Sequence, residues 1–278
     1  MERRHGARAD HAPDVVVADR SADGTTATTV AAMITVGVLG ARGRMGSEAC
    51  RAVDEADDLH LVARVGAGDD RAALAEAQVA VDFTSPAVVL DNITWCVQHG
   101  LSVVAGTSGF TPERLAAVAE LLGAAPEVGV LVVPNFSIGA VLMMRFAAQA
   151  ARFYESVEIV ELHHPGKADA PSGTARRTAQ LVGDARRDAG LGPVPDSTSE
   201  GEVAARGVAV NGVSVHSVRL RGLVASQEVL FGAPGETLAI RHDSHDRQSF
   251  MPGVLAAVRS VVGSRGLVVG LDGVLGLD

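Results

Sequence analysis

A short apolar run followed by regularly spaced glycines is the feature that most limits what this chain can fold into. Residues 33–39 read Met-Ile-Thr-Val-Gly-Val-Leu, and glycines follow at Gly40, Gly43 and Gly46. A helical pattern begins near Arg44. An apolar strand, a glycine turn and a helix in this order are typical of dinucleotide-binding folds, although a loop that merely turns the chain is the alternative. In such folds the glycines let the backbone approach a pyrophosphate, which the N–H groups at the helix start then face.

The alternation of strands and helices continues through the first half of the chain. The expected strands are 59–65, 79–82, 101–105 and 128–133, and the expected helices are 86–97 and 112–122. This alternation predicts an α/β fold with a Rossmann-like, doubly wound parallel sheet. Ligands bind such sheets at the carboxyl ends of the strands, so the loops 40–46, 106–109 and 134–137 should line one crevice.

The second half predicts a second α+β domain with a mixed or antiparallel sheet. Its expected strands are 156–162, 208–210, 213–220, 224–231 and 237–240, and its expected helices are 137–154 and 174–187. A last helix, 249–262, and a last strand, 266–269, should return to the first domain. We assign residues 33–136 and 246–278 to a dinucleotide-binding domain, and residues 137–245 to a substrate-binding and oligomerisation domain. Residues 1–32 lack apolar periodicity, so we expect a disordered tail or a mis-assigned start, with the folded unit beginning at Met33.

Composition argues against several classes of partner. The formal net charge of −9 argues against nucleic acid, because phosphate binding needs a basic face. No apolar run approaches ~18 residues, so no membrane span is expected. Cys50 and Cys96 are isolated and lack the spacing of metal ligands. They are typical of buried thiols in a reducing compartment, and we expect a cytoplasmic protein.

The only lysine of the chain marks the segment where chemistry is expected. Lys and Arg together number 24, and Lys167 alone is a lysine. It offers a compact ammonium with a shiftable pKa, which a guanidinium does not. His163 and His164 lie just before it, and histidine is the side chain that titrates near neutrality. A surface lysine retained by chance is the alternative, and the neighbouring histidines argue against it.

An anion site is expected just after the lysine. Ser172 is a good helix N-cap, and Gly173 and Thr174 would expose N–H groups suited to a carboxylate or phosphate. An ordinary helix cap is the alternative, but the nearby His and Lys favour a site for an anionic substrate. Two adjacent histidines without further ligands argue against zinc, so no metal is expected. Neighbours in a strand face opposite sides, so only one of His163 and His164 should enter a pocket directly unless the chain bends.

The second predicted strand lacks the acid that usually holds the ribose of NAD. The expected position is near Gly66, where the sequence has no carboxylate. Arg42, Arg44 and Arg64 could instead face the 2′-phosphate of NADP. We therefore expect NADPH to bind at least as well as NADH.

These motifs resemble the dihydrodipicolinate reductase family over residues 33–278. The most specific match runs from Glu161 to Thr174 and resembles the substrate signature of the family, and the three loops resemble its cofactor loops. The resemblance implies NADPH- and/or NADH-dependent reduction of 4-hydroxy-tetrahydrodipicolinate, a cyclic imine dicarboxylate, in lysine and diaminopimelate biosynthesis. It also implies a homotetramer.

By position in these motifs, the resemblance also implies roles for individual residues. His163 would act as general acid after hydride reaches C4, and Lys167 would assist it. The substrate contacts would be His164, Ser172, Gly173, Thr174 and Thr107. The cofactor contacts would be Gly40, Ala41, Arg42, Gly43, Arg44, Met45, Gly106, Thr107, Ser108, Val133, Pro134, Asn135 and Phe136.

Two alternatives remain open. A related two-domain dehydrogenase of another anionic substrate, such as homoserine or aspartate semialdehyde, would share the first half. The semialdehyde enzyme would need a nucleophilic cysteine, and Cys50 and Cys96 lie on predicted helices, which is a poor place for one. A non-catalytic NAD(P)-sensing regulator would keep the fold and lose the chemistry.

Overall fold

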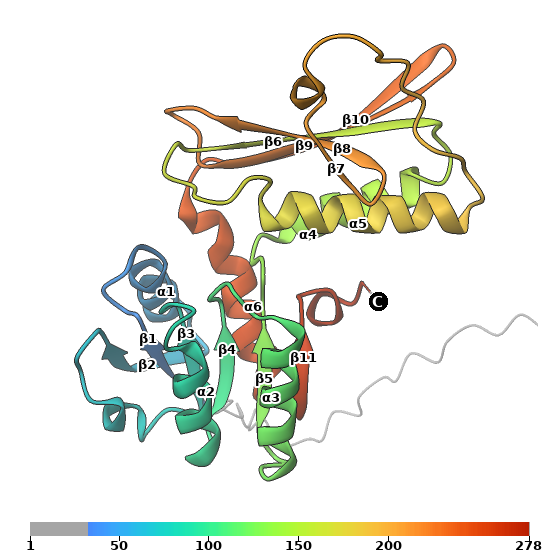
Figure 1. Cartoon of the computed structure of the whole chain (residues 1–278). Helices are drawn as coiled ribbons and strands as arrows, with labels where there is room; N and C mark the ends of the chain where they lie inside the picture. Colours follow the sequence, from blue (N-terminus) through green and yellow to red (C-terminus); the bar gives the residue numbers. More distant parts are fainter. Residues whose placement is uncertain (1–32, 278) are drawn as a thin grey trace, which may run out of the picture. The chain divides into compact units, whose positions relative to one another are not determined.

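The computed structural model describes residues 33–277, apart from the side chains of residues 203 and 204. The predicted tail, residues 1–32, lies outside the described residues. The described chain builds two sheets, one of six strands and one of five (Figure 1).

The six-stranded sheet is parallel throughout and carries the glycine loop. Its strands are β1 (Ile34–Leu39), β2 (Leu59–Val65), β3 (Val79–Asp82), β4 (Ser102–Ala105), β5 (Gly129–Val132) and β11 (Gly266–Val269). Their order is β11-β5-β4-β3-β1-β2, and every pairing is parallel. The order reverses beside β1, so the sheet is doubly wound and Rossmann-like, as the sequence predicted.

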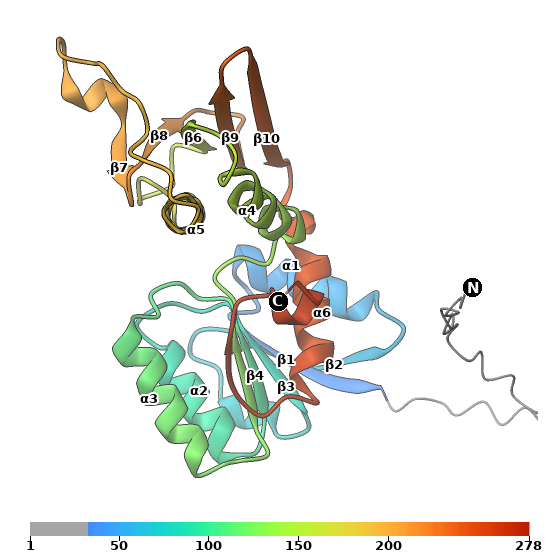
Figure 2. The ribbon, with the colours of Figure 1, turned by 90° about the vertical axis from the view of Figure 1, so that its right-hand side faces the viewer.

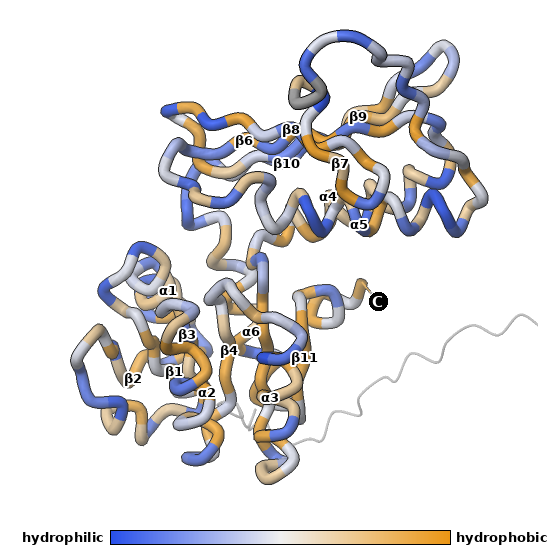
Figure 3. Tube along the Cα trace, viewed as in Figure 1, coloured by the Kyte–Doolittle hydropathy of each residue, from blue (hydrophilic) through white to orange (hydrophobic). Residues whose placement is uncertain are grey.

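Helices cover both faces of this sheet. One face packs against α1 (Arg44–Asp54) and α6 (Met251–Val261), and the other against α2 (Val89–Gln98) and α3 (Pro112–Gly123) (Figure 2). Because both faces are covered, β3, β4 and β5 are buried at every position. Figure 3 shows the hydrophobic residues along these strands.

The five-stranded sheet is mixed and is covered by two helices. Its strands are β6 (Ser156–His163), β7 (Val208–Val210), β8 (Val213–Arg219), β9 (Ala225–Ala233) and β10 (Glu236–Ser244), in the order β10-β9-β6-β8-β7. The β6–β8 pair is parallel, and the other three pairs are antiparallel. The helices α4 (Ile138–Ala150) and α5 (Gly173–Asp188) lie on the same side of this sheet (Figure 2).

Some element boundaries differ from those predicted. The helix expected at 86–97 begins at Val89, because the chain first turns at Pro86, whose carbonyl accepts a hydrogen bond from Arg114 (2.8 Å). The strand expected at 237–240 runs from Glu236 to Ser244, because β10 pairs with β9 along its whole length. Short 3-10 helices were not predicted; they are η1 (Arg71–Leu74), η2 (Val203–Arg206), η3 (Arg247–Phe250) and η4 (Gly273–Leu275).

The end of the described chain returns to the first sheet, where β11 pairs with β5. This pairing supports the assignment of residues 246–278 to the dinucleotide-binding domain, which stays a prediction. No helix in the described part of the chain is long and apolar enough to cross a membrane.

Candidate active site

The loop between β1 and α1 has room only for glycine at two positions. Gly40 has φ +78°, and a Cβ there would lie 2.6 Å from the carbonyl oxygen of Phe83. A Cβ on Gly46 would lie 2.1 Å from the carbonyl oxygen of Gly40. Gly43 caps α1 without a side-chain hydrogen bond to the helix. A side-chain-free loop that leads into a helix N-terminus fits the pyrophosphate of a dinucleotide.

A carboxylate does stand at the end of β2, contrary to the sequence prediction. Asp69 accepts a hydrogen bond from the backbone N–H of Gly66 (2.8 Å) and pairs with Arg42 (2.7 Å). The Arg42 side chain lies against Gly66, where a Cβ would be 2.5 Å from its Nη1. The prediction was wrong because the strand pattern does not reveal the turn after Gly66, which brings the Asp69 carboxylate back to Gly66.

The three arginines proposed for a 2′-phosphate are not equivalent. Arg64 pairs with Asp54 of α1 at 2.5 Å, whereas Arg42 pairs with Asp69, the carboxylate beside Gly66, at 2.7 Å. Arg44 is exposed at the start of α1, and the side chain of Arg42, which belongs to the loop before α1, lies against Gly66 just after β2. Arg42 is thus the arginine that lies beside the position at which the sequence analysis expected an acid.

The loop after β4 is fixed by a buried carboxylate. Asp82, fully buried at the end of β3, accepts hydrogen bonds from the side chains of Thr84 (2.6 Å), Asn92 (2.8 Å) and Thr107 (3.2 Å). The Thr107 hydroxyl therefore points toward Asp82, while Ser108 is exposed. In the loop after β5, Val133 and Phe136 have buried side chains that belong to the core, so their contacts with a cofactor would be made by the backbone.

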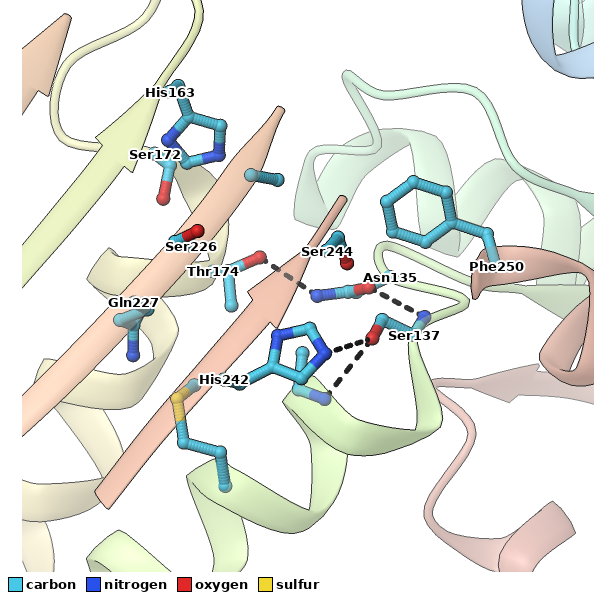
Figure 4. A pocket seen from close by; sticks show the side chains of 13 residues that line it. Asn135, Ser137, His163, Ser172, Thr174, Ser226, Gln227, His242, Ser244 and Phe250 are labelled. Carbon is cyan, nitrogen blue, oxygen red and sulfur yellow. Dashed lines mark hydrogen bonds between the residues drawn. The ribbon is translucent and has the colours of Figure 1, made fainter. Parts of the chain in front are cut away.

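A polar pocket lies where the loop after β5, the N-terminus of α5 and the strands β6, β9 and β10 meet (Figure 4). Its polar lining residues are Asn135, Ser137, His163, Ser172, Thr174, Ser226, Gln227, His242 and Ser244. The structure thus brings four predicted residues together: Asn135, His163, Ser172 and Thr174. The predicted residues Thr107, His164, Lys167 and Gly173 are not among the residues that line this pocket.

Hydrogen bonds join the two sides of the pocket. Asn135 donates from Nδ2 to Oγ1 of Thr174 (3.0 Å) and accepts from the backbone N–H of Ser137 (2.8 Å). Ser137 Oγ caps α4 and is hydrogen-bonded to Nε2 of His242 (3.0 Å) (Figure 4). Ser172 caps α5 by accepting from the N–H of Ala175 (3.1 Å), as the sequence predicted.

His163 is the last residue of β6, and its ring is held by a carboxylate. Its Nδ1 lies 2.5 Å from Oε2 of Glu161. Burial lowers the pKa of His163, and this effect outweighs the Glu161 carboxylate, which raises it; Lys167 and Arg219 lower the pKa further. His163 is therefore mainly neutral in the ligand-free protein at neutral pH.

Lys167 lies beside the pocket and is held by a carboxylate. Its Nζ donates to Oδ1 of Asp169 (2.7 Å). Burial would raise the pKa of Asp169, but the hydrogen bond and the charge of Lys167 lower it overall, so Asp169 is ionised. The ammonium is close enough to His163 to lower the pKa of that ring.

Several site residues were missed by the sequence analysis. Arg219 binds Glu161 through two hydrogen bonds of 2.8 Å each, and His242 and Gln227 line the pocket from β10 and β9. Gln227 donates from Nε2 to Thr178 (2.8 Å), but its buried Oε1 has no partner among the described residues. A bound molecule with a donor group would satisfy this acceptor. Glu161 had a signal in the sequence, because residues two apart on a strand share a face.

Comparison with known proteins covers nearly all of the described residues. A family model described as dihydrodipicolinate reductase, N-terminus, matches residues 34–136, and one described as dihydrodipicolinate reductase, C-terminus, matches residues 139–275. The chain belongs to the dihydrodipicolinate reductase family. The chain is accordingly an NAD(P)H-dependent oxidoreductase, and the resemblance stated from the motifs is confirmed.

Individual relatives in this family cover nearly the same residues. A 4-hydroxy-tetrahydrodipicolinate reductase of Cutibacterium acnes is 61% identical over 246 residues, which are 88% of this chain and 100% of that protein. The one from Streptomyces coelicolor is 59% identical over 245 residues, 87% of this chain and 98% of that protein. A solved dihydrodipicolinate reductase from Paenisporosarcina sp. TG-14, with dipicolinate bound, is 37% identical. It has a TM-score of 0.75 and covers 87% of this chain and 99% of its own.

Proposed function

We propose that this chain reduces 4-hydroxy-tetrahydrodipicolinate to tetrahydrodipicolinate with NADPH or NADH. The observation that carries the proposal is the pocket that His163 and the N-terminus of α5 line together. The Nδ1 atom of His163 contacts the Glu161 carboxylate. A helix N-terminus suits a carboxylate of the substrate, and a histidine suits proton transfer. The relatives in Cutibacterium acnes and Streptomyces coelicolor carry the name of this reaction.

His163 supplies the proton in this mechanism. The 4-hydroxyl leaves as water together with a proton from C3, which leaves a double bond between C3 and C4 that is conjugated with the imine. When bound, the nicotinamide would supply a hydride to C4 of this double bond. Negative charge then moves toward C3, and Nε2 of His163 donates the proton that C3 takes up. Overall, one hydride and one proton are consumed, and one water is released.

The other pocket residues bind and orient the substrate. Thr174 and the N–H groups at the start of α5 bind one carboxylate, and Asn135 fixes the Thr174 hydroxyl. Lys167 exchanges Asp169 for a substrate carboxylate and stabilises the charge that develops in the transition state. We retain His164, Ser172, Gly173 and Thr107 as proposed substrate contacts, although Ser172 acts mainly as the helix cap.

In this proposal the cofactor binds at the carboxyl ends of the strands of the first sheet. The pyrophosphate lies on the loop from Gly40 to Met45, and the ribose lies near Asp69 and Arg42. The loops after β4 and β5 lie at the carboxyl ends of their strands, where nicotinamide cofactors bind in doubly wound sheets.

We further propose that the chain assembles into a homotetramer through the five-stranded sheet. Val157, Ile159 and Glu161 of β6 face the helices, so Val160 and Leu162 point to the opposite face. Leu230 of β9 is 40% exposed. The same face also carries Glu158 and Glu228, so it presents apolar side chains among charged ones, as many subunit interfaces do. A molar mass of one chain by light scattering would contradict this assembly.

Turnover by the purified protein tests the proposed function. The substrate is generated in the cuvette by the enzyme that condenses its precursors, and loss of NADPH or NADH absorbance is followed. Oxidation that depends on the generated substrate is expected. Cofactor binding without oxidation would favour an NAD(P)-sensing regulator, and oxidation only with another anionic substrate would favour a related dehydrogenase.

The pH dependence of the reaction should differ between kcat/KM and kcat. An acid must carry its proton, so activity falls as pH rises through the pKa of His163. In the free protein burial lowers this pKa from its usual 6.5, and two substrate carboxylates raise it in the complex. The descending limb of the pH profile, where activity falls as pH rises, should therefore lie at lower pH for kcat/KM than for kcat. Profiles of both parameters test this, and limbs in the reverse order would contradict it.

Arg42 and Asp69 should set the choice of cofactor. Arg42→Ala is expected to weaken NADPH about 10- to 100-fold more than NADH, because hydrogen bonds to charged groups contribute ~1.5–3 kcal/mol. Asp69→Ala should weaken NADH more than NADPH, because it removes the carboxylate near the ribose hydroxyls. Dissociation constants from nicotinamide fluorescence measure both effects.

The comparison variant is Arg64→Ala, since Arg64 pairs with Asp54 of α1 and not with the carboxylate beside Gly66. A selective loss of NADPH in this variant would instead support the three-arginine site predicted from the sequence. A strong preference of the unmodified protein for NADH would defeat the expectation that NADPH binds at least as well.

A further inference from the structure

Glu161 is a fully buried carboxylate that is held by donors from several parts of the chain. Its oxygens accept hydrogen bonds from Nη1 and Nη2 of Arg219 (2.8 Å each) and from the backbone N–H of Ser172 (3.2 Å), and Oε2 lies 2.5 Å from Nδ1 of His163. Burial would raise the pKa of Glu161, but the hydrogen bonds, first that from Arg219, lower it overall. The side chain is therefore an ionised acceptor with no proton to give.

This ionised state decides which nitrogen of His163 carries the proton. A carboxylate only accepts, so Nδ1 of His163 must be the donor at 2.5 Å. In the neutral ring Nε2 is then unprotonated, and it is the nitrogen left to gain and give a proton. The second nitrogen of a catalytic histidine is commonly fixed by such a partner.

Arg219 links the same carboxylate to the lysine segment. Its Nη2 also donates to the backbone carbonyl of Asp169 (2.7 Å), and the side chain of Asp169 holds Lys167. Ser172, whose N–H binds Glu161, caps α5. One ion pair thus fixes the general acid, the lysine segment and the helix that faces the pocket.

We propose that Glu161, held by Arg219, is a positioning residue of the reaction: it fixes the Nδ1–H tautomer of His163 and stabilises the imidazolium that donates the proton. This inference rests on the proposed function. Its geometry comes from β6 itself, since Glu161 and His163 are two apart and share the face that packs on α5. The Arg219 pair keeps the buried carboxylate ionised while leaving Oε2 available to the ring.

The first test needs no turnover. In the unmodified protein, nitrogen NMR of the histidine rings should show the neutral His163 protonated on Nδ1, with the signal assigned by its loss in His163→Gln. A neutral ring protonated on Nε2 would overturn the proposal. Because this readout reports the ring itself, it stands even if the protein turns over another substrate.

The second test replaces the carboxylate. In Glu161→Gln the Arg219 donors hold the amide oxygen, so the amide NH2 faces Nδ1 and opposes a proton there. We expect kcat to fall by about 10²- to 10⁴-fold. The descending limb of the kcat profile should also move to lower pH, because the imidazolium loses its counter-charge. Glu161→Asp, which retains the charge, should recover part of the activity and place the limb nearer that of the unmodified protein.

Controls separate positioning from stability. Loss of one partner of a buried pair can unfold a protein, so the double variant Glu161→Gln/Arg219→Gln removes both charges together. Asp58→Asn weakens an exposed ion pair in which Arg259 donates two hydrogen bonds to Asp58. This variant should leave kcat and the pH of the descending limb unchanged. A folded Glu161→Gln or double variant with normal kcat and an unmoved limb would overturn the proposal. A lower kcat with an unmoved limb would assign Glu161 a merely structural role.

Discussion

Replacing His163 by Gln is expected to lower kcat by about 10²- to 10⁴-fold, the usual contribution of a general acid, with a much smaller change in KM. Glutamine keeps a polar group of similar reach but cannot carry a transferable proton at neutral pH. The substrate carboxylates would still be bound by Thr174 and Lys167, so binding should largely survive. Steady-state kinetics with NADPH at saturating concentration measure both parameters.

A histidine with a comparable Nδ1 contact serves as the control. His99 lies at the end of α2, and its Nδ1 is 2.7 Å from the carbonyl oxygen of Trp95. His99→Gln should leave kcat within about twofold, because surface substitutions away from the site cost little. Full turnover by a folded His163→Gln variant would remove His163 from the acid role.

Replacing Lys167 by Met is expected to lower kcat/KM by about 10²- to 10³-fold, as loss of one charged donor to the transition state does. Methionine has a similar length but no charge. Lys167→Arg should not restore the activity, because a guanidinium would bind Asp169 through two parallel hydrogen bonds and remain there. The measurement is kcat and KM for both variants.

A surface cation gives the control for this pair of variants. Arg265 pairs with Glu127, and neither residue lines the pocket. Their side chains are 70% and 73% exposed. Arg265→Met should therefore be silent. Near-normal activity of Lys167→Met would show that the lone lysine is an accident of composition, and near-normal activity of Lys167→Arg would show that charge alone is needed.

The order of the strands and helices could be predicted because it depends on local patterns. The apolar run Val79–Val81 is buried on both faces, as is typical of a strand in a parallel sheet that is covered by helices on both faces. The turn at Pro86 and the length of β10 could not be predicted, since each depends on a partner distant in sequence: Arg114 for the turn and β9 for the strand. Tertiary contacts override local propensity at such places.

The candidate site was predictable only where its residues are neighbours in sequence. His163, Lys167 and Ser172 lie within one short segment, so their residue types alone indicated chemistry. Arg219 follows Glu161 by 58 residues and meets it because β6 and β8 pair in parallel. The prediction that no carboxylate lies near Gly66 failed for the same reason, because Asp69 reaches Gly66 through a turn that the strand pattern does not reveal.

The most direct test of the account follows the transferred hydrogen. The purified protein would turn over generated substrate with NADPH deuterated at the transferable position of the nicotinamide, and the product would be examined by NMR. The account predicts one deuterium at C4 of the product ring and a solvent-derived hydrogen at C3. Oxidation of the cofactor with no deuterium at C4 would contradict the proposed reduction at this site.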